Sequence, residues 1–120
     1  MRRTQPTMRC RRGDVVLVNF VFSEETGVKR RPAVVVSSEV YHGGREEAII
    51  AAVTSNVDRL LMGDHLISGW RQAGLLYPSV ATGIIRTIKQ AMVARRLGSL
   101  PEGDLQAVSD NLRLSLDLAT

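Results

Sequence analysis

The apolar residues of this 120-residue chain change their spacing close to residue 100, and this change limits the folds that the chain can adopt. Before that point they form short runs, such as residues 15–18, separated by glycine and polar residues, which is typical of β-strands. After it they recur at steps of three and four, as one face of a helix requires. The recurring residues are Leu105, Val108, Leu112, Leu116 and Ala119. The order predicts a strand-rich domain that ends in a single amphipathic helix.

Six segments have the composition of short strands, with apolar residues bounded by glycine, proline or polar residues. They cover residues 14–20, 32–37, 48–53, 65–67, 79–88 and 92–97. Gly83 interrupts the fifth segment and predicts a bulge or a corner. The predicted fold class is therefore mainly β: a small, strongly bent antiparallel sheet or barrel of five to six strands with a C-terminal α-helix.

The connections between these segments carry turn signals. Residues 23–30 are polar, contain a glycine and predict a loop. Residues 40–44 end in two glycines and predict at most one irregular turn. Ser99, followed three residues later by Glu102, predicts a capping box at the start of the C-terminal helix.

The first twelve residues differ from the rest of the chain because they hold five arginines, one proline and almost nothing apolar. A segment of this kind has little to bury. We expect residues 1–12 to form a basic, flexible arm and residues 13–120 to form a single domain, since the chain is too short for two independent cores.

The composition excludes several classes of protein. A single cysteine, Cys10, cannot form an internal disulfide, and no apolar run is long enough for a signal peptide or a membrane span, so we expect a cytoplasmic protein. Two histidines and one cysteine are too few for a structural zinc site. No glycine-rich nucleotide-binding motif occurs, so we expect neither a metal nor a cofactor.

Positive charge is in excess, because 16 Lys and Arg against 12 Asp and Glu give a formal net charge of +4. All the basic residues except Lys29 and Lys89 are arginines. Arginine suits bidentate contact with phosphate. This favours a polyanionic partner, although a GC-rich genome would enrich arginine in the same way.

Two places combine a predicted strand end with side chains suited to phosphate. Arg30 and Arg31 stand where a polar loop is expected to meet the strand that begins at Pro32. A rigid strand would fix Arg31 and leave it accessible, although such a pair is also common on ordinary surfaces. The third predicted strand ends in three small residues that can hydrogen-bond a phosphate or cap a turn. These are Thr54, Ser55 and Asn56.

Further candidates are single residues or pairs. His42 and His65 could form an acid–base pair, or could be ordinary surface or half-buried histidines. Cys10 stands among arginines, which would lower the pKa of its thiol, but no histidine lies near it in sequence. Arg86 and Thr87 lie next to the predicted sheet corner.

Five short motifs follow one another at characteristic intervals. They are RGDVV at 12–16, RPAVVVS at 31–37, IAAVTSN at 50–56, RTI at 86–88 and LGSL at 97–100. In this order they resemble the MazF/PemK family of toxin–antitoxin ribonucleases. The resemblance covers about residues 12–118, which is nearly the whole chain.

This resemblance implies an SH3-like barrel with a C-terminal helix, a homodimer, a cognate antitoxin, and DNA binding through the complex with that antitoxin. It also implies metal-independent cleavage of single-stranded mRNA by attack of the 2′-hydroxyl, which leaves a 2′,3′-cyclic phosphate and a 5′-hydroxyl. The family's catalytic arginine and threonine fall on Arg31 and Thr54. The expected RNA-binding residues are Arg30, Ser55, Asn56, Arg86 and Thr87. The base would be His65 or a group of the substrate.

The chain departs from the family pattern between the third strand and the fifth. Many members carry an acidic residue where Tyr77, Pro78 and Ser79 stand, and the spacing to Arg86 is one residue shorter than is common. Met8 begins a run that resembles the usual start of the family, so we expect residues 1–7 to be an upstream extension.

Two other functions remain open on the sequence. One is a non-catalytic, arginine-rich barrel that binds RNA or a protein. The other is a related barrel toxin that poisons DNA gyrase, a group that lacks the arginine–proline motif found here.

Overall fold

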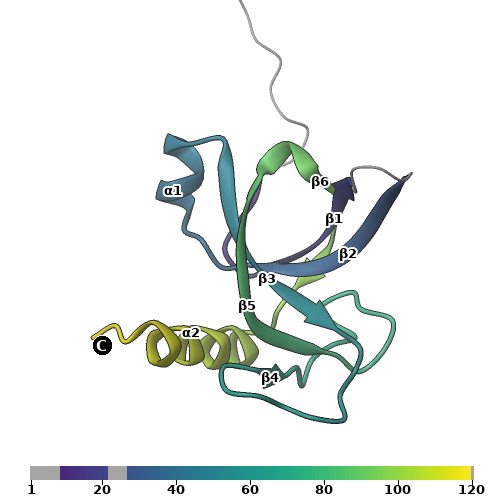
Figure 1. Ribbon diagram of the computed structural model, residues 1–120, viewed down its shortest axis with the longest axis vertical. Coiled ribbons are helices and arrows are strands. Elements are labelled where there is room, and N and C mark those ends of the chain that lie inside the picture. The colour runs from purple at the N-terminus through teal and green to yellow at the C-terminus, as the bar shows by residue number, and fades with distance from the viewer. Residues whose placement is uncertain (1–8, 22–26, 120) are drawn as a thin grey trace, which may run out of the picture.

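The computed structural model describes residues 9–21 and 27–119. In chain order the elements are β1 (Asp14–Val21), β2 (Val28–Val35), α1 (Glu39–Gly44), β3 (Glu47–Thr54), β4 (His65–Leu66), β5 (Val80–Lys89), the 3₁₀ turn η1 (Gln90–Met92), β6 (Val93–Ser99) and α2 (Glu102–Leu116). Figure 1 shows the strands curving around one another, with α2 below them and α1 at the other end of the fold. The predicted mainly-β fold with a C-terminal helix is confirmed. No helix in residues 9–21 or 27–119 is long and apolar enough to span a membrane.

The strands of the described ranges belong to one antiparallel sheet, in the order β4-β5-β3-β2-β1-β6. Its edges are β6 and β4, and β4 has only two residues. No strand pairing joins these two edges within the described ranges, so the sheet curves strongly but does not close into a barrel. A two-residue strand offers too few backbone groups to close such a ladder.

The predicted corner at Gly83 is confirmed. The pairing of β3 with β5 shifts its register between Ala51 and Val53, and Gly83 lies on the opposite strand at this point. The Thr82 hydroxyl donates a hydrogen bond to the carbonyl oxygen of Ala52 at 2.8 Å, which holds the strands together where the regular ladder is interrupted.

Two hydrophobic clusters lie on the two faces of the central strands. Val15 and Val34 belong to the cluster that packs against α2 through Val108. Their neighbours Val16 and Val35 belong to the other cluster. Because successive residues of a strand point to opposite faces, this alternation shows that both faces of the sheet are buried.

Strand β2 begins earlier than the sequence predicts. Residues 28–30, expected in a loop, pair with β1 in register, with Arg30 opposite Asn19. This prediction was wrong because pairing with a neighbouring strand supplies backbone hydrogen bonds that a charged local sequence does not reveal. Arg31 therefore lies inside the strand rather than at its start. The rest of the expected loop, residues 22–26, lies outside the described residues.

Both helices begin differently from the prediction. The short α1 replaces the expected irregular turn because the Ser38 hydroxyl caps it, accepting the backbone N–H three residues later at 3.2 Å. The capping box of Ser99 and Glu102 is wrong, since α2 begins after Pro101, which makes no side-chain cap bond. Ser99 belongs to β6, where its hydroxyl accepts a hydrogen bond from Arg96 at 2.7 Å.

The expected basic arm is described only in part, since residues 1–8 lie outside the described residues. Cys10 is buried in the core at 3% exposure, and Arg12 donates to the carbonyl oxygen of Val36 at 2.7 Å. Burial, with a smaller effect of the Asp14 charge, raises the pKa of the Cys10 thiol. This direction is opposite to the one expected from the neighbouring arginines.

A buried carboxylate ties β4 to α2. Asp104 is 4% exposed and accepts hydrogen bonds from His65 Nε2 at 2.7 Å and from the backbone N–H groups of Ser68 and Gly69 at 2.8 and 2.9 Å. Burial by itself would raise the pKa of this carboxyl, but the three hydrogen bonds outweigh burial and hold the pKa below its ordinary value.

We expect Asp104 to make the fold sensitive to acid. Because the pKa of Asp104 is lowered on folding, its contribution to stability is complete above about pH 4 and is lost as the pH falls through the folded-state value. Asp104→Ala should therefore lower the free energy of unfolding at neutral pH and remove this part of the acid dependence. Urea unfolding at a series of pH values measures both effects, and an identical pH profile in the variant would contradict the assignment.

Candidate functional site

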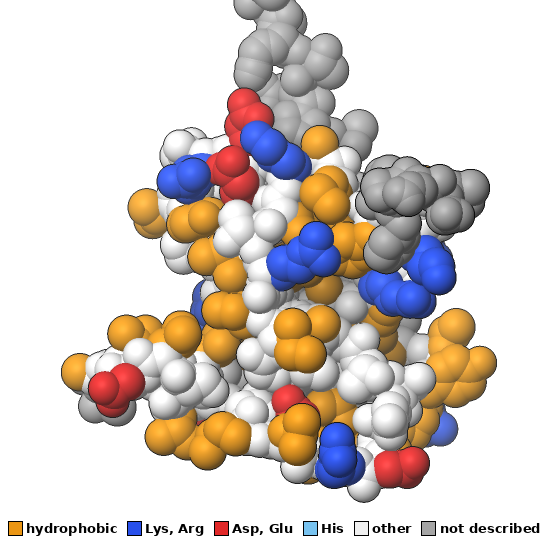
Figure 2. Space-filling view, in the orientation of Figure 1, with side chains coloured by type: hydrophobic (Ala, Val, Ile, Leu, Met, Phe, Trp, Pro, Cys, Tyr) orange, Lys and Arg blue, Asp and Glu red, His pale blue; other side chains and the backbone are white. Residues whose placement is uncertain are grey.

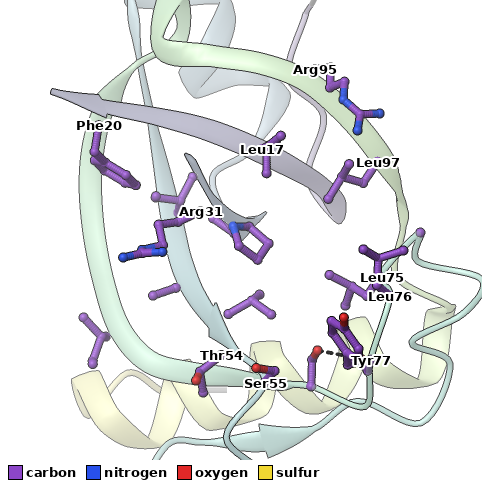
Figure 3. Close-up of a pocket in the computed structure, with 18 of the residues that line it drawn as sticks. Leu17, Phe20, Arg31, Thr54, Ser55, Leu75, Leu76, Tyr77, Arg95 and Leu97 are labelled. Carbon is purple, nitrogen blue, oxygen red and sulfur yellow. Dashed lines mark hydrogen bonds between the residues drawn. The ribbon is translucent and has the colours of Figure 1, made fainter. Parts of the chain in front are cut away.

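An open cavity of about 1020 Å³ lies among β1, β2, β3, β5, β6 and the segment before β5. Figure 3 shows Arg31 and Phe20 on one side of it, Arg95 on the other, and Thr54 and Ser55 at its lower end. The described residues that line it include arginines but no aspartate or glutamate. Walls with unneutralised positive charge attract an anionic ligand.

Three arginines reach this cavity from three different strands: Arg31 from β2, Arg86 from β5 and Arg95 from β6. With the other described residues, none of the three forms an ion pair or a hydrogen bond. Arg86 instead lies over the ring of Phe20, with its Cζ 4.7 Å from the ring centroid. As far as the described residues go, the guanidinium donors are therefore available to the oxygen atoms of a ligand.

Strand β2 fixes the backbone of Arg31. Its register partner on β1 is Val18, which is fully buried, and Pro32 follows it with a restricted φ angle. The Arg31 side chain itself is exposed. A rigid backbone with an accessible guanidinium is the arrangement that a binding site needs.

The end of β3 supplies two hydroxyl groups. Thr54 is the last residue of the strand, and its Oγ1 accepts the backbone N–H of Asn56 at 3.1 Å. This bond fixes the hydroxyl as an acceptor on one side and leaves its proton for a ligand. Ser55 lines the same cavity, whereas Asn56 lines a smaller, neighbouring one.

Alternation along the strands separates two predicted RNA-binding residues from the cavity. Arg30 is the neighbour of Arg31, and its Nε donates to Asn19 Oδ1 at 2.9 Å. Thr87 is exposed and follows Arg86, so its side chain points to the other face of β5. Neither Arg30 nor Thr87 lines the cavity, whereas Arg31, Thr54, Ser55 and Arg86 do.

Neither of the two histidines lines the cavity. His65 donates to Asp104, and His42 is buried with its Nε2 2.6 Å from the Ser37 hydroxyl. Because α1 and β4 lie at opposite ends of the fold (Figure 1), the two imidazoles do not form an acid–base pair. Across residues 9–21 and 27–119, no group of three His, Cys, Asp or Glu side chains is placed to hold a metal ion.

Two residues that line the cavity, Arg95 and Tyr77, were not predicted as site residues from the sequence. Arg95 reaches the cavity because β6 pairs with β1, where Arg95 stands opposite Leu17. The side chain of its neighbour Arg96 lies on the other face of β6, where its Nε donates a hydrogen bond to Oδ1 of the buried Asp14 at 3.1 Å. Tyr77 lines the cavity with 64% of its surface exposed, and an exposed aromatic ring can stack on a base. Only alternation along β6 could have indicated Arg95.

The fold and the cavity together define a class: a small, curved β-sheet protein with one C-terminal helix and an arginine-lined cavity at the end of its third strand. Residues 11–116 match the family described as PemK-like, MazF-like toxins of type II toxin–antitoxin systems. The match spans most of the chain, and the protein belongs to this family. The resemblance stated from the sequence is thereby confirmed. No curated protein matches this chain in sequence.

Solved structures share the fold. A MazE–MazF crystal structure from Deinococcus radiodurans has a TM-score of 0.77 at 20% identity, over 93% of this chain and 99% of that one. The Mycobacterium tuberculosis toxin MazF-mt6 has a TM-score of 0.72 at 21% identity, over 89% and 99%. A structure described as an endoribonuclease in complex with its cognate antitoxin, from a mycobacterial species, has a TM-score of 0.72 at 16% identity, over 92% and 98%.

Proposed function

We propose that this protein is a toxin that acts as an endoribonuclease on single-stranded RNA. The observation that carries the proposal is the cavity that Arg31, Arg86 and Arg95 line together with Thr54, with no carboxylate among the described lining residues. Three guanidinium groups and a hydroxyl suit a phosphodiester. The reaction class is supported by mycobacterial structures of the same fold that are described as endoribonucleases.

The proposed reaction uses the 2′-hydroxyl of the RNA as the nucleophile. Its oxygen attacks the adjacent phosphorus and forms a new oxygen–phosphorus bond, while the bond from phosphorus to the 5′-oxygen breaks. The proton of the 2′-hydroxyl passes to a phosphate oxygen of the substrate or to solvent, and the leaving 5′-oxygen gains a proton. The products are a 2′,3′-cyclic phosphate and a 5′-hydroxyl.

In this proposal Arg31 and Thr54 act on the phosphate. A guanidinium keeps its proton at neutral pH, so Arg31 stabilises the charge that develops on the phosphate oxygens and can donate to the leaving oxygen. Thr54 donates its free proton to a phosphate oxygen and orients it. Because His65 is bound to Asp104 and lies outside the cavity, a phosphate oxygen of the substrate or solvent, rather than His65, receives the proton of the 2′-hydroxyl.

We expect cleavage to continue in excess EDTA, because arginines supply the charge stabilisation that this mechanism requires. The test is incubation of the purified protein with single-stranded RNA, with and without chelator, followed by mass spectrometry of the fragment ends. Cyclic phosphate and 5′-hydroxyl ends are expected. Activity that EDTA abolishes and Mg²⁺ restores, or 5′-phosphate ends, would contradict the mechanism. Binding without cleavage across a broad RNA pool would favour the non-catalytic barrel.

The proposal includes two protein partners. Figure 2 shows hydrophobic side chains gathered over the end of α2, where Leu114, Leu116 and Leu118 are at least half exposed, and a second copy of the chain would cover such a surface. A cognate antitoxin with an acidic segment would compete with RNA for the arginine-lined cavity. Sedimentation of the purified protein at micromolar concentration should show a dimer, and a monomer would contradict the proposed pairing of two copies. DNA binding through the antitoxin complex stays a prediction.

A further inference from the structure

A second cavity, of about 540 Å³, adjoins the main one and shares Thr54 and Ile84 with it. Its outer wall is the segment between β3 and β4, which contributes Asn56, Asp58 and Arg59. Since Thr54 lines both cavities, an RNA whose phosphate binds at Thr54 has a neighbouring base within reach of the second cavity.

The two cavities differ in their charge. The main cavity has arginines and no carboxylate among its described lining residues, whereas the second is lined by Asp58 and Asp64 together with Arg59. A carboxylate repels phosphate but accepts hydrogen bonds from the N–H groups of a base edge. The second cavity is therefore suited to a base and the main one to the phosphate.

Of the three charged side chains that line the second cavity, only that of Asp64 is hydrogen-bonded to other described residues. The carboxylate of Asp64 accepts two backbone N–H groups, each at 2.9 Å, so each of its oxygens already has a donor from the protein. The backbone of Asp58 is fixed, because its N–H donates to Asn56 Oδ1 at 3.1 Å. The Asp58 carboxylate and the Arg59 guanidinium form no hydrogen bond or ion pair with other residues of the described part of the chain.

We propose that the second cavity binds a guanine next to the cleaved phosphate, with Asp58 accepting N1–H and the 2-amino group and Arg59 donating to O6. Guanine presents two donors side by side with an acceptor beyond them, which suits a cavity lined by both a carboxylate and a guanidinium. Adenine, cytosine and uracil lack that pair of adjacent donors. This inference rests on the proposed function, because the RNA must first lie in the main cavity.

The test separates base recognition from cleavage. A short, single-stranded RNA pool is randomised in sequence and carries fluorine in place of each 2′-hydroxyl, so that it cannot be cut by 2′-hydroxyl attack. The full-length protein retains part of the pool on a filter, and the retained RNA is sequenced. The parent protein should enrich guanine at one position by about tenfold over the other bases.

Asp58→Asn should abolish that enrichment and favour adenine, because an amide offers one donor and one acceptor where guanine needs two acceptors. Arg59→Gln should also reduce it. Asp117→Asn is the matched control, since it removes the same charge at the exposed C-terminal end of α2, outside both cavities, and should keep the parent's preference.

Two results would overturn the inference: no guanine enrichment by the parent protein, or unchanged enrichment by Asp58→Asn. Failure of the proposed cleavage alone would give another result: the parent protein would select guanine from the fluorinated pool but would not cut ordinary RNA.

Discussion

Replacing Arg31 with alanine should lower the rate of RNA cleavage by roughly 10²–10³-fold, which is typical of removing one preorganised donor to a developing oxyanion. The fold should survive, because the Arg31 side chain is exposed and pairs with no other described residue. Single-turnover cleavage of a labelled RNA gives the rate, and thermal unfolding reports on the fold.

Three further variants test the proposed roles of Arg31 and Thr54. Arg31→Lys should restore activity only in part, because an ammonium cannot reproduce the two-pronged guanidinium contact. Thr54→Val should also slow cleavage, because it keeps the shape and removes the hydroxyl. Arg30→Ala is the matched control: it removes the same charge one residue away, where the side chain binds Asn19 outside the cavity, and should change the rate only a few-fold. Parent-like activity in Arg31→Ala would place the site elsewhere.

Gly74→Ala should lower the free energy of unfolding by about 3 kcal/mol or more, the range expected when a substitution strains the backbone and overpacks its surroundings. Gly74 has a φ of +83°, which side chains rarely adopt. A Cβ at this position would lie 2.1 Å from the carbonyl oxygen of Leu97 and 2.6 Å from its carbonyl carbon. These are backbone atoms of β6, so the strand itself would have to move.

The control for this change is another glycine-to-alanine substitution. Gly103 lies in α2, and a Cβ there would meet nothing within 4 Å. Gly103→Ala should therefore keep or raise the stability, by up to about 1 kcal/mol, because alanine is the better helix former. Urea unfolding of both variants gives the comparison, and a Gly74→Ala protein as stable as the parent would contradict the close packing of that segment on β6.

The parts of the fold that depend on local pattern could be predicted from the sequence. The corner at Gly83 and the helical period through Leu105, Val108 and Leu112 are set by residues close together in the chain, and both are confirmed. The last two residues of the predicted apolar face were wrong, since Leu116 is half exposed and Ala119 lies beyond the end of α2. The start of β2 was missed because residues 28–30 become a strand only through pairing with β1. The true start of α2 was missed because Ser99 ends a strand and binds Arg96 there.

The same distinction applies to the candidate site. The sequence motifs single out Arg31 and Thr54, and the structure brings these two residues to one cavity. The sequence could not tell which member of the pairs Arg30–Arg31 and Arg86–Thr87 faces the cavity, because that depends on the strand register. Arg95 was missed for the same reason, since it reaches the cavity only through the pairing of β6 with β1.

In the proposed mechanism this cavity presents a phosphate to the 2′-hydroxyl of the preceding nucleotide. The most direct test is cleavage of an RNA oligonucleotide that carries one 2′-deoxy nucleotide on the 5′ side of the cleaved bond. We expect the protein to bind this RNA with nearly the affinity of the unmodified one and to leave that bond intact. Cleavage of the modified bond at the rate of the unmodified one would contradict the mechanism.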